Sequence, residues 1–563
     1  MTHLLNPFEE EGEYLLAIHT KHVKSNEVIE TVRNAKRIGE EHFNLFLKER
    51  FVEKSKPVSH PIKKMCLSIF DTPEKKKVPA DKAKLHVLQQ DCSLFSRLYI
   101  ACQFRDGNLE DFFKYENQPW PPSLSQFGQL REGQKADLIN CLTSLSAQVP
   151  TTTKPSVDAV IIDGAVIVQM LQPKTVRSFD EYFTAIFAPY ILRILQNSSR
   201  IDLVWDVYKV DSLKKSLRDK RGSGQRRKVM ASTRIPTDWK GFLKVDENKD
   251  ELFKFLANKL VSLTIPDGKE IYTTYGDDVL WLSSTQRDVD YLVPCSHEEA
   301  DTRLIVHARD ATLSGHRRIL IKSNDTDVVV LAVSVAGFIQ ADEVWVTFGS
   351  GKNMRYIPAH IVAKSLGTDK ASALPVFHAL TGCDTVSFFG GRGKKTAWEI
   401  WKIFPQLTPV LMTLKAAPTT EALSRLVPLL ERFMVLLYDR TSSLNRVDEA
   451  RQELFSKKSR CIDGIPPTQA ALHEHVKRAV HQGSFVWGQT LLKQPIIPSP
   501  SEWGWQRQGV MWTPYWTELP QAKDTCYELI HCKCKGPCRG RCKCTRANLA
   551  CTGLCNCGGN CQR

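Results

Sequence analysis

The chain has 563 residues, 42% of them hydrophobic and 25% charged, a composition typical of folded proteins that excludes wholesale disorder and a fibrous class. The 77 Lys and Arg outnumber the 62 Asp and Glu, so the formal net charge is +15 and an anionic partner is favoured. The longest apolar run, residues 328–339, is too short to cross a bilayer, and the first residues lack the basic-then-apolar order of a secretory signal. We therefore expect a soluble intracellular protein with no membrane partner.

Residues 1–150 are predicted to form a mostly helical region whose role the sequence leaves open. Residues 27–51 have an amphipathic pattern, and residues 72–84 are polar, rich in lysine and bounded by proline. The region is interpreted as a scaffold or a partner-binding segment. Its three consecutive lysines, residues 75–77, fit either a solvated loop or a weak nuclear-import signal.

The pattern changes after residue 150 to short apolar runs rich in Val and Ile, separated by helical segments. The four runs are residues 157–163, 201–206, 318–323 and 343–348. Continuous runs of this kind predict an α/β fold in which a parallel sheet is flanked by helices on both faces. In such sheets, function lies at the carboxyl ends of the strands.

Acidic residues occur repeatedly at those ends. Two close the first two runs, two follow the third, two open a helical stretch, and one follows a later apolar segment; they are Asp163, Asp206, Asp325, Asp327, Glu299, Asp301 and Asp384. Any one of them alone could be a loop cap or a favourable charge in the first turn of a helix. Together in one cleft they would repel one another unless cations were present, and Mg²⁺ or Mn²⁺ suits such oxygen ligands better than zinc. Two ions about 4 Å apart could hydrolyse a phosphodiester.

The order of the short motifs resembles that of the flap-endonuclease group of PIN-like 5′ nucleases over residues 157–405. IIDG at 161–164, WD at 205–206, EAD at 299–301, NDTD at 324–327 and GCD at 382–384 are similar to the acidic motifs of that family. The resemblance implies that all seven acids are catalytic, metal-binding carboxylates and that DNA is the partner. Strict flap specificity does not follow, because about 150 residues precede the resemblance.

Two further features resemble DNA contacts of the same family. GGRGKKTAWEI at 390–400 resembles its helix-hairpin-helix, which implies phosphate contacts by Gly391, Gly393, Lys394 and Lys395. The alternative is a glycine-rich loop that only joins two helices. Residues 207–230, with a net charge of +7, occupy the place of the family's helical arch and offer Lys214, Lys215, Arg218 and Lys220 as phosphate ligands. The alternative is a solvated basic loop.

The end of the chain is dense in cysteine. Nine cysteines have the spacing C-x-C-x3-C-x3-C-x-C-x6-C-x3-C-x-C-x3-C: Cys532, Cys534, Cys538, Cys542, Cys544, Cys551, Cys555, Cys557 and Cys561. They match three tetrahedral Zn²⁺ ions if three thiolates bridge two metals each. The segment resembles a tesmin-type CXC zinc domain, which implies DNA binding; the alternative is metal storage.

The chain is thus predicted to divide into a helical region (1–150), a PIN-like nuclease domain (151–405) with a basic arch-like insertion (207–290) and a helix-hairpin-helix (385–404), a helical extension (406–490), a Trp- and Pro-rich linker (491–525) and a CXC zinc domain (526–563). The predicted function is that of a nuclear, Mg²⁺- or Mn²⁺-dependent nuclease that cuts DNA selectively by structure and is anchored by its zinc tail. The arrangement also resembles proteins related to mobile elements. The alternatives are an inactive DNA-binding regulator or scaffold derived from such a nuclease, and an RNA-directed nuclease.

Overall fold

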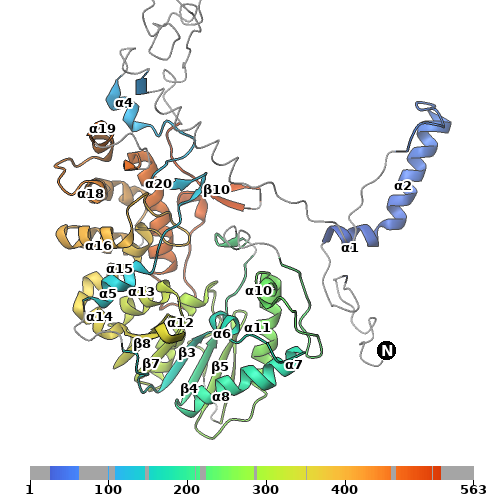
Figure 1. The fold of residues 1–563 in the computed structure, drawn as a ribbon, viewed down its shortest axis with the longest axis horizontal. Coiled ribbons are helices and arrows are strands. Elements are labelled where there is room, and N and C mark those ends of the chain that lie inside the picture. Colours follow the sequence, from blue (N-terminus) through green and yellow to red (C-terminus); the bar gives the residue numbers. More distant parts are fainter. Residues whose placement is uncertain are drawn as a thin grey trace, which may run out of the picture. The chain divides into compact units, whose positions relative to one another are not determined.

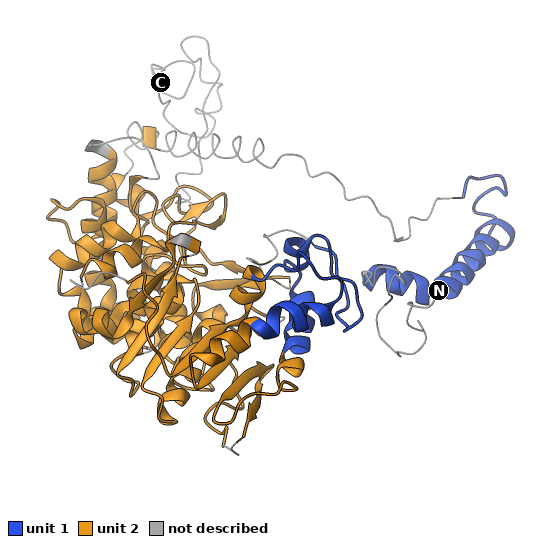
Figure 2. Cartoon of the chain, turned by 60° about the horizontal axis from the view of Figure 1, so that its bottom comes forward, with its two compact units in different colours: residues 1–78, 171–189, 221–256 blue, residues 79–170, 190–220, 257–563 orange. Residues whose placement is uncertain are grey.

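The computed structural model describes most of the chain between residues 26 and 520, as two compact units (Figures 1 and 2). Unit 1 contains residues 1–78, 171–189 and 221–256, and unit 2 contains residues 79–170, 190–220 and 257–563. The described residues are 15, 26–62, 99–100, 108–145, 151–209, 211–215, 218, 224–284, 288–349, 351–416, 418–457, 464–509 and 511–520. The nine predicted zinc ligands and Lys220 lie outside them.

A seven-stranded sheet forms the centre of unit 2, in the order β6-β5-β4-β3-β7-β8-β9 (Figure 1). Five neighbouring strands from β5 to β8 are parallel, and the edge strands β6 and β9 are antiparallel to their neighbours. The strands are β3 (Ala159–Asp163), β4 (Arg200–Val204), β5 (Glu270–Tyr275), β6 (Asp278–Ser283), β7 (Arg318–Lys322), β8 (Glu343–Phe348) and β9 (Arg355–Pro358). The predicted α/β fold with a parallel sheet flanked by helices is confirmed.

The strand order reverses direction at β3. The chain first builds β4 and β5 on one side of β3 and later places β7 and β8 on the other side. At such a reversal the connections leave in opposite directions, and a crevice opens at the carboxyl ends of the two strands. Here those strands are β3 and β7, both of which lead into acidic residues.

Helices pack on this sheet, and further helices of unit 2 pack on those helices. α12 contacts β3, β4 and β7, while α13 and α14 contact β8. The helices of unit 2 are α4 (Leu109–Lys114), α5 (Asp137–Thr143), α6 (Gly164–Met170), α12 (Ala300–Leu313), α13 (Thr326–Val335), η3 (Gly351–Asn353), α14 (Ala359–Leu366), α15 (Thr368–Leu380), α16 (Lys394–Ile403), α17 (Leu407–Lys415), α18 (Thr420–Tyr438), α19 (Val447–Lys457), α20 (Gln469–Val480), η5 (His481–Val486) and η6 (Pro500–Glu502). Two small hairpins, β1 (Ser125–Gln126) with β2 (Gln129–Leu130) and β10 (Trp505–Gln508) with β11 (Met511–Pro514), complete the unit.

One hydrophobic core runs through unit 2 regardless of the predicted boundaries. It includes Phe112 and Leu138 from before residue 150, Ile161 from the sheet, and Trp401 and Trp503 from the carboxyl-terminal part. Residues from before position 150, from the sheet and from after position 405 therefore bury their apolar side chains against one another within unit 2.

Two predicted features within this region need correction. The range 207–290, predicted as an insertion, contains β5 and β6, which are strands of the main sheet. Their sequence, EIYTTY and DVLWLS, carries polar residues and lacks the continuous apolar pattern of the other strands. Within 385–404 the structure has one helix, α16, and the helix before the turn is α15, which ends at Leu380.

Unit 1 has its own aromatic cluster. Phe179 and Tyr182 pack against Trp239, which stacks on Phe242 with ring centroids 5.3 Å apart. Its helices are α1 (Asn26–Arg33), α2 (Ala35–Leu47), η1 (Lys48–Val52), α7 (Phe179–Tyr182), η2 (Phe183–Phe187) and α10 (Trp239–Phe242), and α8 (Ala188–Gln196) and α11 (Asp246–Leu260) each have residues in both units. Among all helices that the structure describes, none is long and apolar enough to cross a membrane.

Candidate active site

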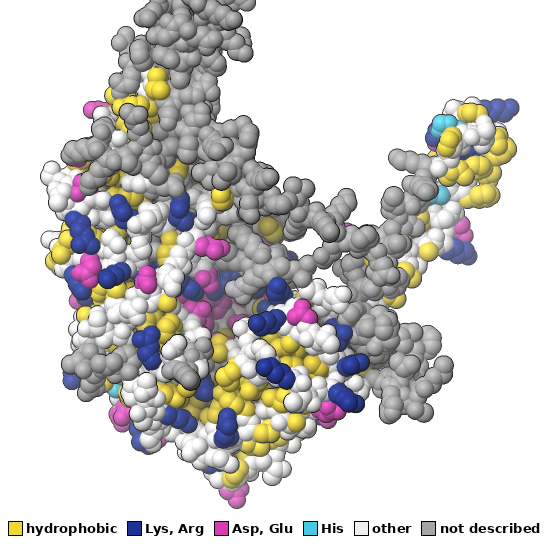
Figure 3. Space-filling model, viewed as in Figure 1, with side chains coloured by type: hydrophobic (Ala, Val, Ile, Leu, Met, Phe, Trp, Pro, Cys, Tyr) yellow, Lys and Arg dark blue, Asp and Glu magenta, His cyan; other side chains and the backbone are white. Residues whose placement is uncertain are grey.

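All seven acidic residues singled out in the sequence belong to unit 2, at or near the carboxyl end of its sheet. Asp163 ends β3, Asp206 follows β4 by two residues, and Asp325 and Asp327 surround the start of α13 after β7. Glu299 and Asp301 lie at the start of α12, and Asp384 follows α15. In Figure 3 acidic side chains gather in a hollow of the visible face. The closest three are Asp301, Asp325 and Asp327, which bring carboxylate oxygens within 4.8 Å of one another.

The residues beside Asp163 and Asp206 explain why these two acids come together. Gly164 leaves room for the indole of Trp205, since a Cβ on Gly164 would lie 2.1 Å from that ring. The backbone N–H of Trp205 donates to the hydroxyl of Thr274 in β5, at 2.9 Å. The pair Gly164 and Trp205 therefore locks the end of β3 to the end of β4 and fixes the spacing of the carboxylates that follow.

Two helix starts position most of the other carboxylates. Asp325 caps α13 by accepting a hydrogen bond from the backbone N–H of Asp327 at 2.9 Å. Asp206 accepts from the first N–H of α12, that of Ala300, at 2.9 Å. Glu299 is the residue that precedes α12, and Asp301 lies in its first turn. The positive ends of two helices thus face the same group of acids.

Two lysine ammonium groups are inserted among the carboxylates. Lys135 contacts three of them, with its Nζ 3.2 Å from Asp325, 3.1 Å from Asp327 and 2.9 Å from Asp384. Lys214 contacts Glu299 at 2.7 Å. Both lysine side chains are less than a fifth exposed. They offset part of the negative charge.

The remaining charge imbalance appears in the pKa values of the acids. Burial and the Asp206 carboxylate raise the pKa of Asp163 to about 7. Burial and neighbouring carboxylates likewise raise the pKa of Asp325 above its ordinary value and that of Asp301 well above it. Burial would also raise the pKa of Asp327, but the Lys135 ammonium and the His378 hydrogen bond hold it below its usual range. Two ammonium groups do not neutralise the cluster.

This donor set fits hard divalent cations. The cluster consists of carboxylate oxygens, several of which are buried and held at fixed positions by hydrogen bonds. Mg²⁺ and Mn²⁺ bind such oxygens, whereas zinc sites usually contain His or Cys. Raised carboxyl pKa values indicate a site where added positive charge is favourable. We conclude that the group can hold Mg²⁺ or Mn²⁺.

A histidine behind the cluster orients Asp327. His378, in α15, is fully buried, and its Nε2 donates to a carboxylate oxygen of Asp327 at 2.8 Å. Its ring stacks on Trp487, with centroids 5.5 Å apart. Burial lowers the pKa of His378 to about 4, so the imidazole is neutral at physiological pH. A neutral ring that donates through Nε2 fixes one oxygen of Asp327, and the other oxygen contacts the Lys135 ammonium group.

Lys394 does not have the predicted role. Its side chain is fully buried, and its Nζ donates to the backbone oxygen of His378 and to the hydroxyl of Thr381. Burial lowers its pKa to about 7. The amine therefore supports the loop beneath α15 and does not reach a phosphate on the surface.

The rest of the predicted turn is at the surface. Gly391 and Gly393 are exposed; Gly391 has a φ of +65°, which favours glycine, and Gly393 caps the N-terminus of α16. Lys395 is exposed in the first turn of the same helix. These three residues keep the geometry of an anion-binding helix start.

The arch candidates take different positions. Lys214 is part of the carboxylate cluster, as described above. Arg218 donates to Glu298 at 3.3 Å, and its guanidinium lies 5.3 Å from the ring centroid of Tyr208. Lys215 is half-buried. Lys214 and Arg218 are thus each paired with a glutamate.

Sequence reasoning missed Lys135 and His378. Lys135 lies in a segment without any recognised motif, 192 residues before Asp327. His378 is an isolated histidine in an apolar helix, a pattern more typical of a satisfied core residue. Only the folded structure connects them to the acidic motifs.

Comparisons with known proteins found similar solved structures at low sequence identity. No protein-family model matches the chain, and no curated protein matches its sequence. Among solved structures, one of the catalytic core of Rad2 in complex with DNA substrate is 17% identical, covering 48% of this chain and 67% of that one, with a TM-score of 0.27. Another of the same core is 16% identical, covering 61% of this chain and 97% of that one, with a TM-score of 0.28. Because these TM-scores are low, function is inferred from the site alone.

Proposed function

We propose that the chain is a PIN-like nuclease that uses Mg²⁺ or Mn²⁺ to hydrolyse phosphodiester bonds in DNA, with selectivity for branched or single-stranded structure. The observation that carries the proposal is the convergence of seven carboxylates at the carboxyl end of a parallel sheet, where the raised pKa values of Asp163, Asp301 and Asp325 favour added cations. The net charge of +15 and the exposed turn at Gly391 and Lys395 fit a polyanionic substrate.

The residues of the site would bind the cations, orient the carboxylates and contact the phosphate. When bound, divalent ions would supply positive charge to the scissile phosphate and to the attacking water. Ser323 donates to Asp163 at 3.1 Å and His378 donates to Asp327, so both carboxylates keep a fixed orientation. Lys214 pairs with Glu299 in the free protein. Its long, flexible side chain can move so that the ammonium group contacts a phosphate oxygen of the substrate.

The test is cleavage of end-labelled flap, single-stranded, duplex and RNA substrates with Mg²⁺ or Mn²⁺. We expect cutting of DNA that the double variant Asp325→Asn/Asp327→Asn loses by several orders of magnitude while still binding DNA. Asp342→Asn is the matched control, because Asp342 is 63% exposed and forms a surface ion pair with Arg317. Equal cutting by wild type and double variant would exclude these carboxylates as the active site, and preferred cutting of RNA would change the substrate.

A second candidate function is supported by Lys135. Its ammonium group already lies among Asp325, Asp327 and Asp384, where a cation is expected. This arrangement favours a DNA-binding regulator that keeps the nuclease fold without cutting. Binding of DNA with no cleavage of any substrate at millimolar Mg²⁺ or Mn²⁺ would select this candidate.

Residues 526–563 are proposed to form a CXC zinc domain that binds three Zn²⁺ and anchors the protein on duplex DNA in the nucleus. The support is the spacing of the nine cysteines and the basic charge between them. Three zinc atoms per chain by metal analysis, and weaker duplex binding when zinc is removed, are the expected results. The mobile-element origin is also a proposal.

A further inference from the structure

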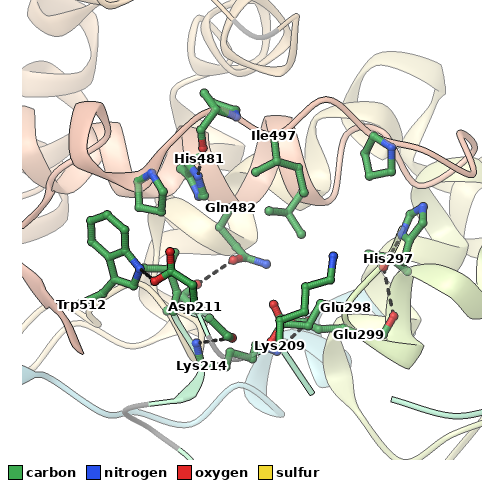
Figure 4. Close-up of a pocket in the computed structure, with 18 of the residues that line it drawn as sticks. Lys209, Asp211, Lys214, His297, Glu298, Glu299, His481, Gln482, Ile497 and Trp512 are labelled. Carbon is green, nitrogen blue, oxygen red and sulfur yellow. Dashed lines mark hydrogen bonds and ion pairs between the residues drawn. The ribbon is translucent and has the colours of Figure 1, made fainter. Parts of the chain in front are cut away.

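A cavity of about 420 Å³ adjoins the carboxylate cluster, and Glu299 belongs to both (Figure 4). Its walls come from segments far apart in the sequence: residues 209 and 211–214, the start of α12 and the residues just before it, η5, residues 495 and 497–500, and Trp512. Apolar side chains, among them Val486 and Ile497, form part of the lining. The volume is enough for a planar heterocycle with an attached sugar.

The charged groups around the cavity have partners within the protein. Lys214 pairs with Glu299 at 2.7 Å and Arg218 with Glu298 at 3.3 Å, while Lys209 donates to the backbone oxygen of Ser296 at 2.9 Å and Asp211 accepts from the indole N–H of Trp512 at 2.9 Å. Because both glutamates are paired with cations, a neutral ligand part meets no uncompensated acid there.

Two adjacent polar side chains have unsatisfied atoms at this cavity. Gln482 is 3% exposed, and its Oε1 accepts from Thr385 at 2.8 Å, while its Nε2 has no hydrogen-bond partner among the described residues. Figure 4 shows that amide nitrogen pointing into the open space. His481 is also 3% exposed; its Nε2 donates to the backbone oxygen of Pro498 at 3.0 Å, and its Nδ1 lacks a partner in the described part of the chain.

Unsatisfied buried groups of this kind point to a ligand. Leaving a polar group buried without a partner costs about 1–3 kcal/mol, so a ligand that pairs with it regains that free energy. Reversing the amide of Gln482 would put the oxygen, instead of the nitrogen, towards the cavity, and one polar atom would still face it. The Gln482 amide and the His481 imidazole can form hydrogen bonds with the polar edge of a nucleobase, and the apolar walls can contact its flat faces.

We propose that this cavity binds one unpaired nucleobase of the DNA strand, that of a nucleotide next to the phosphate held at the carboxylates. The inference rests on the proposed function and adds its source of selectivity. A base inside a duplex must leave the stack to enter, at a cost of a few kcal/mol, whereas a base in a flap, loop or single strand enters at little cost. The nuclease then prefers phosphates beside unpaired nucleotides.

Ile497→Trp tests the proposal by filling the cavity, and Ile496→Trp is its matched control. Ile497 lines the cavity and is 44% exposed, whereas the neighbouring Ile496 is 82% exposed and is not part of the lining. Gln482→Glu serves as a second variant, since it keeps the acceptor for Thr385 and changes the atom that faces the cavity. Thermal unfolding of each variant confirms that it is folded.

The first measurement is saturation-transfer NMR with the four deoxynucleoside monophosphates in the absence of divalent metal. We expect signals from base protons with wild type and Ile496→Trp, and their loss with Ile497→Trp and Gln482→Glu. The second is binding of flap DNA, in Ca²⁺, with an abasic residue at each position around the junction. One abasic position should weaken wild-type binding roughly tenfold and leave Ile497→Trp unchanged.

The outcomes separate the cavity from the nuclease. A flat abasic series, or equal behaviour of Ile497→Trp and Ile496→Trp, overturns the base-binding proposal even if Mg²⁺-dependent cutting is intact. If base-proton signals and an abasic effect are observed but no DNA is cut, base binding in the cavity is supported and the proposed nuclease activity is refuted. A wild type that binds neither mononucleotide nor DNA overturns both.

Discussion

Lys135→Met should destabilise the metal-free protein and strengthen its binding of divalent metal. The Lys135 ammonium group lies 3.1 Å from the carboxylate of Asp327, which is 1% exposed. It lies 3.2 Å from Asp325 and 2.9 Å from Asp384, which are about a third exposed. Removing one partner of a buried ion pair costs about 3–5 kcal/mol, and exposed pairs contribute up to about 1 kcal/mol each. Because His378 still donates to Asp327, we take the lower limit, about 3 kcal/mol.

The same free energy predicts the metal affinity. If a cation must displace Lys135 from these carboxylates, binding to wild type is weakened by the contacts that are lost. About 3 kcal/mol then corresponds to roughly a hundredfold lower Kd for Mn²⁺ in Lys135→Met, since each 1.4 kcal/mol is about tenfold. Removal of the lysine also removes a competitor that stays protonated: burial alone would lower the pKa of Lys135, but the carboxylates of Asp327, Asp325 and Asp384 raise it above its ordinary value.

Two assays check this reasoning. Urea unfolding without metal gives the loss of stability, and titration with Mn²⁺ followed by electron paramagnetic resonance gives the Kd. Lys395→Met is the control, because Lys395 is exposed and its loss should change stability by less than about 0.5 kcal/mol. An unchanged or weaker Mn²⁺ affinity in Lys135→Met would refute the idea that the ammonium group occupies the cation position.

Three other variants test the structure around the site. Gly164→Ala should lose about 2–3 kcal/mol in urea unfolding, because its Cβ would overlap the Trp205 ring; in Gly393→Ala the new Cβ meets no atom within 4 Å, so only the poorer capping of α16 should cost stability, less than about 1 kcal/mol. Equal effects would contradict the packing argument. Arg200→Met should cost about 3–5 kcal/mol, because buried Asp202 would lose its guanidinium partner and keep the contact with His307, against less than about 1 kcal/mol for the exposed Arg317→Met; similar losses would reject a buried pair. Burial lowers the pKa of His475 to about 3, below the ordinary value near 6.5. Between these two pH values the unfolded chain binds a proton that the folded chain does not, so stability falls as the pH falls from about 6.5 to about 3. His475→Gln should therefore reduce the slope of stability against pH, between pH 6 and 4, by about 1.4 kcal/mol per pH unit, and an unchanged slope would exclude this histidine.

Local sequence patterns predicted the sheet best where strands are buried on both faces. The apolar run 157–163 became β3 at Ala159–Asp163, and 318–323 became β7 at Arg318–Lys322. Acids directly after such strands could be placed at one edge of the sheet, because parallel strands end there together. β5 was missed because its hydroxyl groups have a packing role: those of Thr273 and Thr274 accept hydrogen bonds from Trp205.

Features that depend on tertiary contacts could not be predicted. Lys394 follows a glycine turn like a surface cation, but its amine is buried under α15. Lys135 contributes to the carboxylate cluster from a segment that the sequence marks only as part of a helical region. The cavity needs Gln482, from a helical region near the other end of the described chain, beside Glu299. Sequence periodicity reports which face of an element is buried, and does not report which distant element covers it.

The continuous core of unit 2 has a consequence for the synthesis of the protein. Ile161 in β3 and Trp503 are part of the same core, separated by more than three hundred residues of chain. At about 5–20 residues per second, a ribosome needs roughly 20–70 s to complete that interval. During this time the apolar face of β3, and later that of α15, is without its full set of partners, so the nascent chain is expected to depend on chaperones. Fragments that stop near residue 405 should aggregate when expressed.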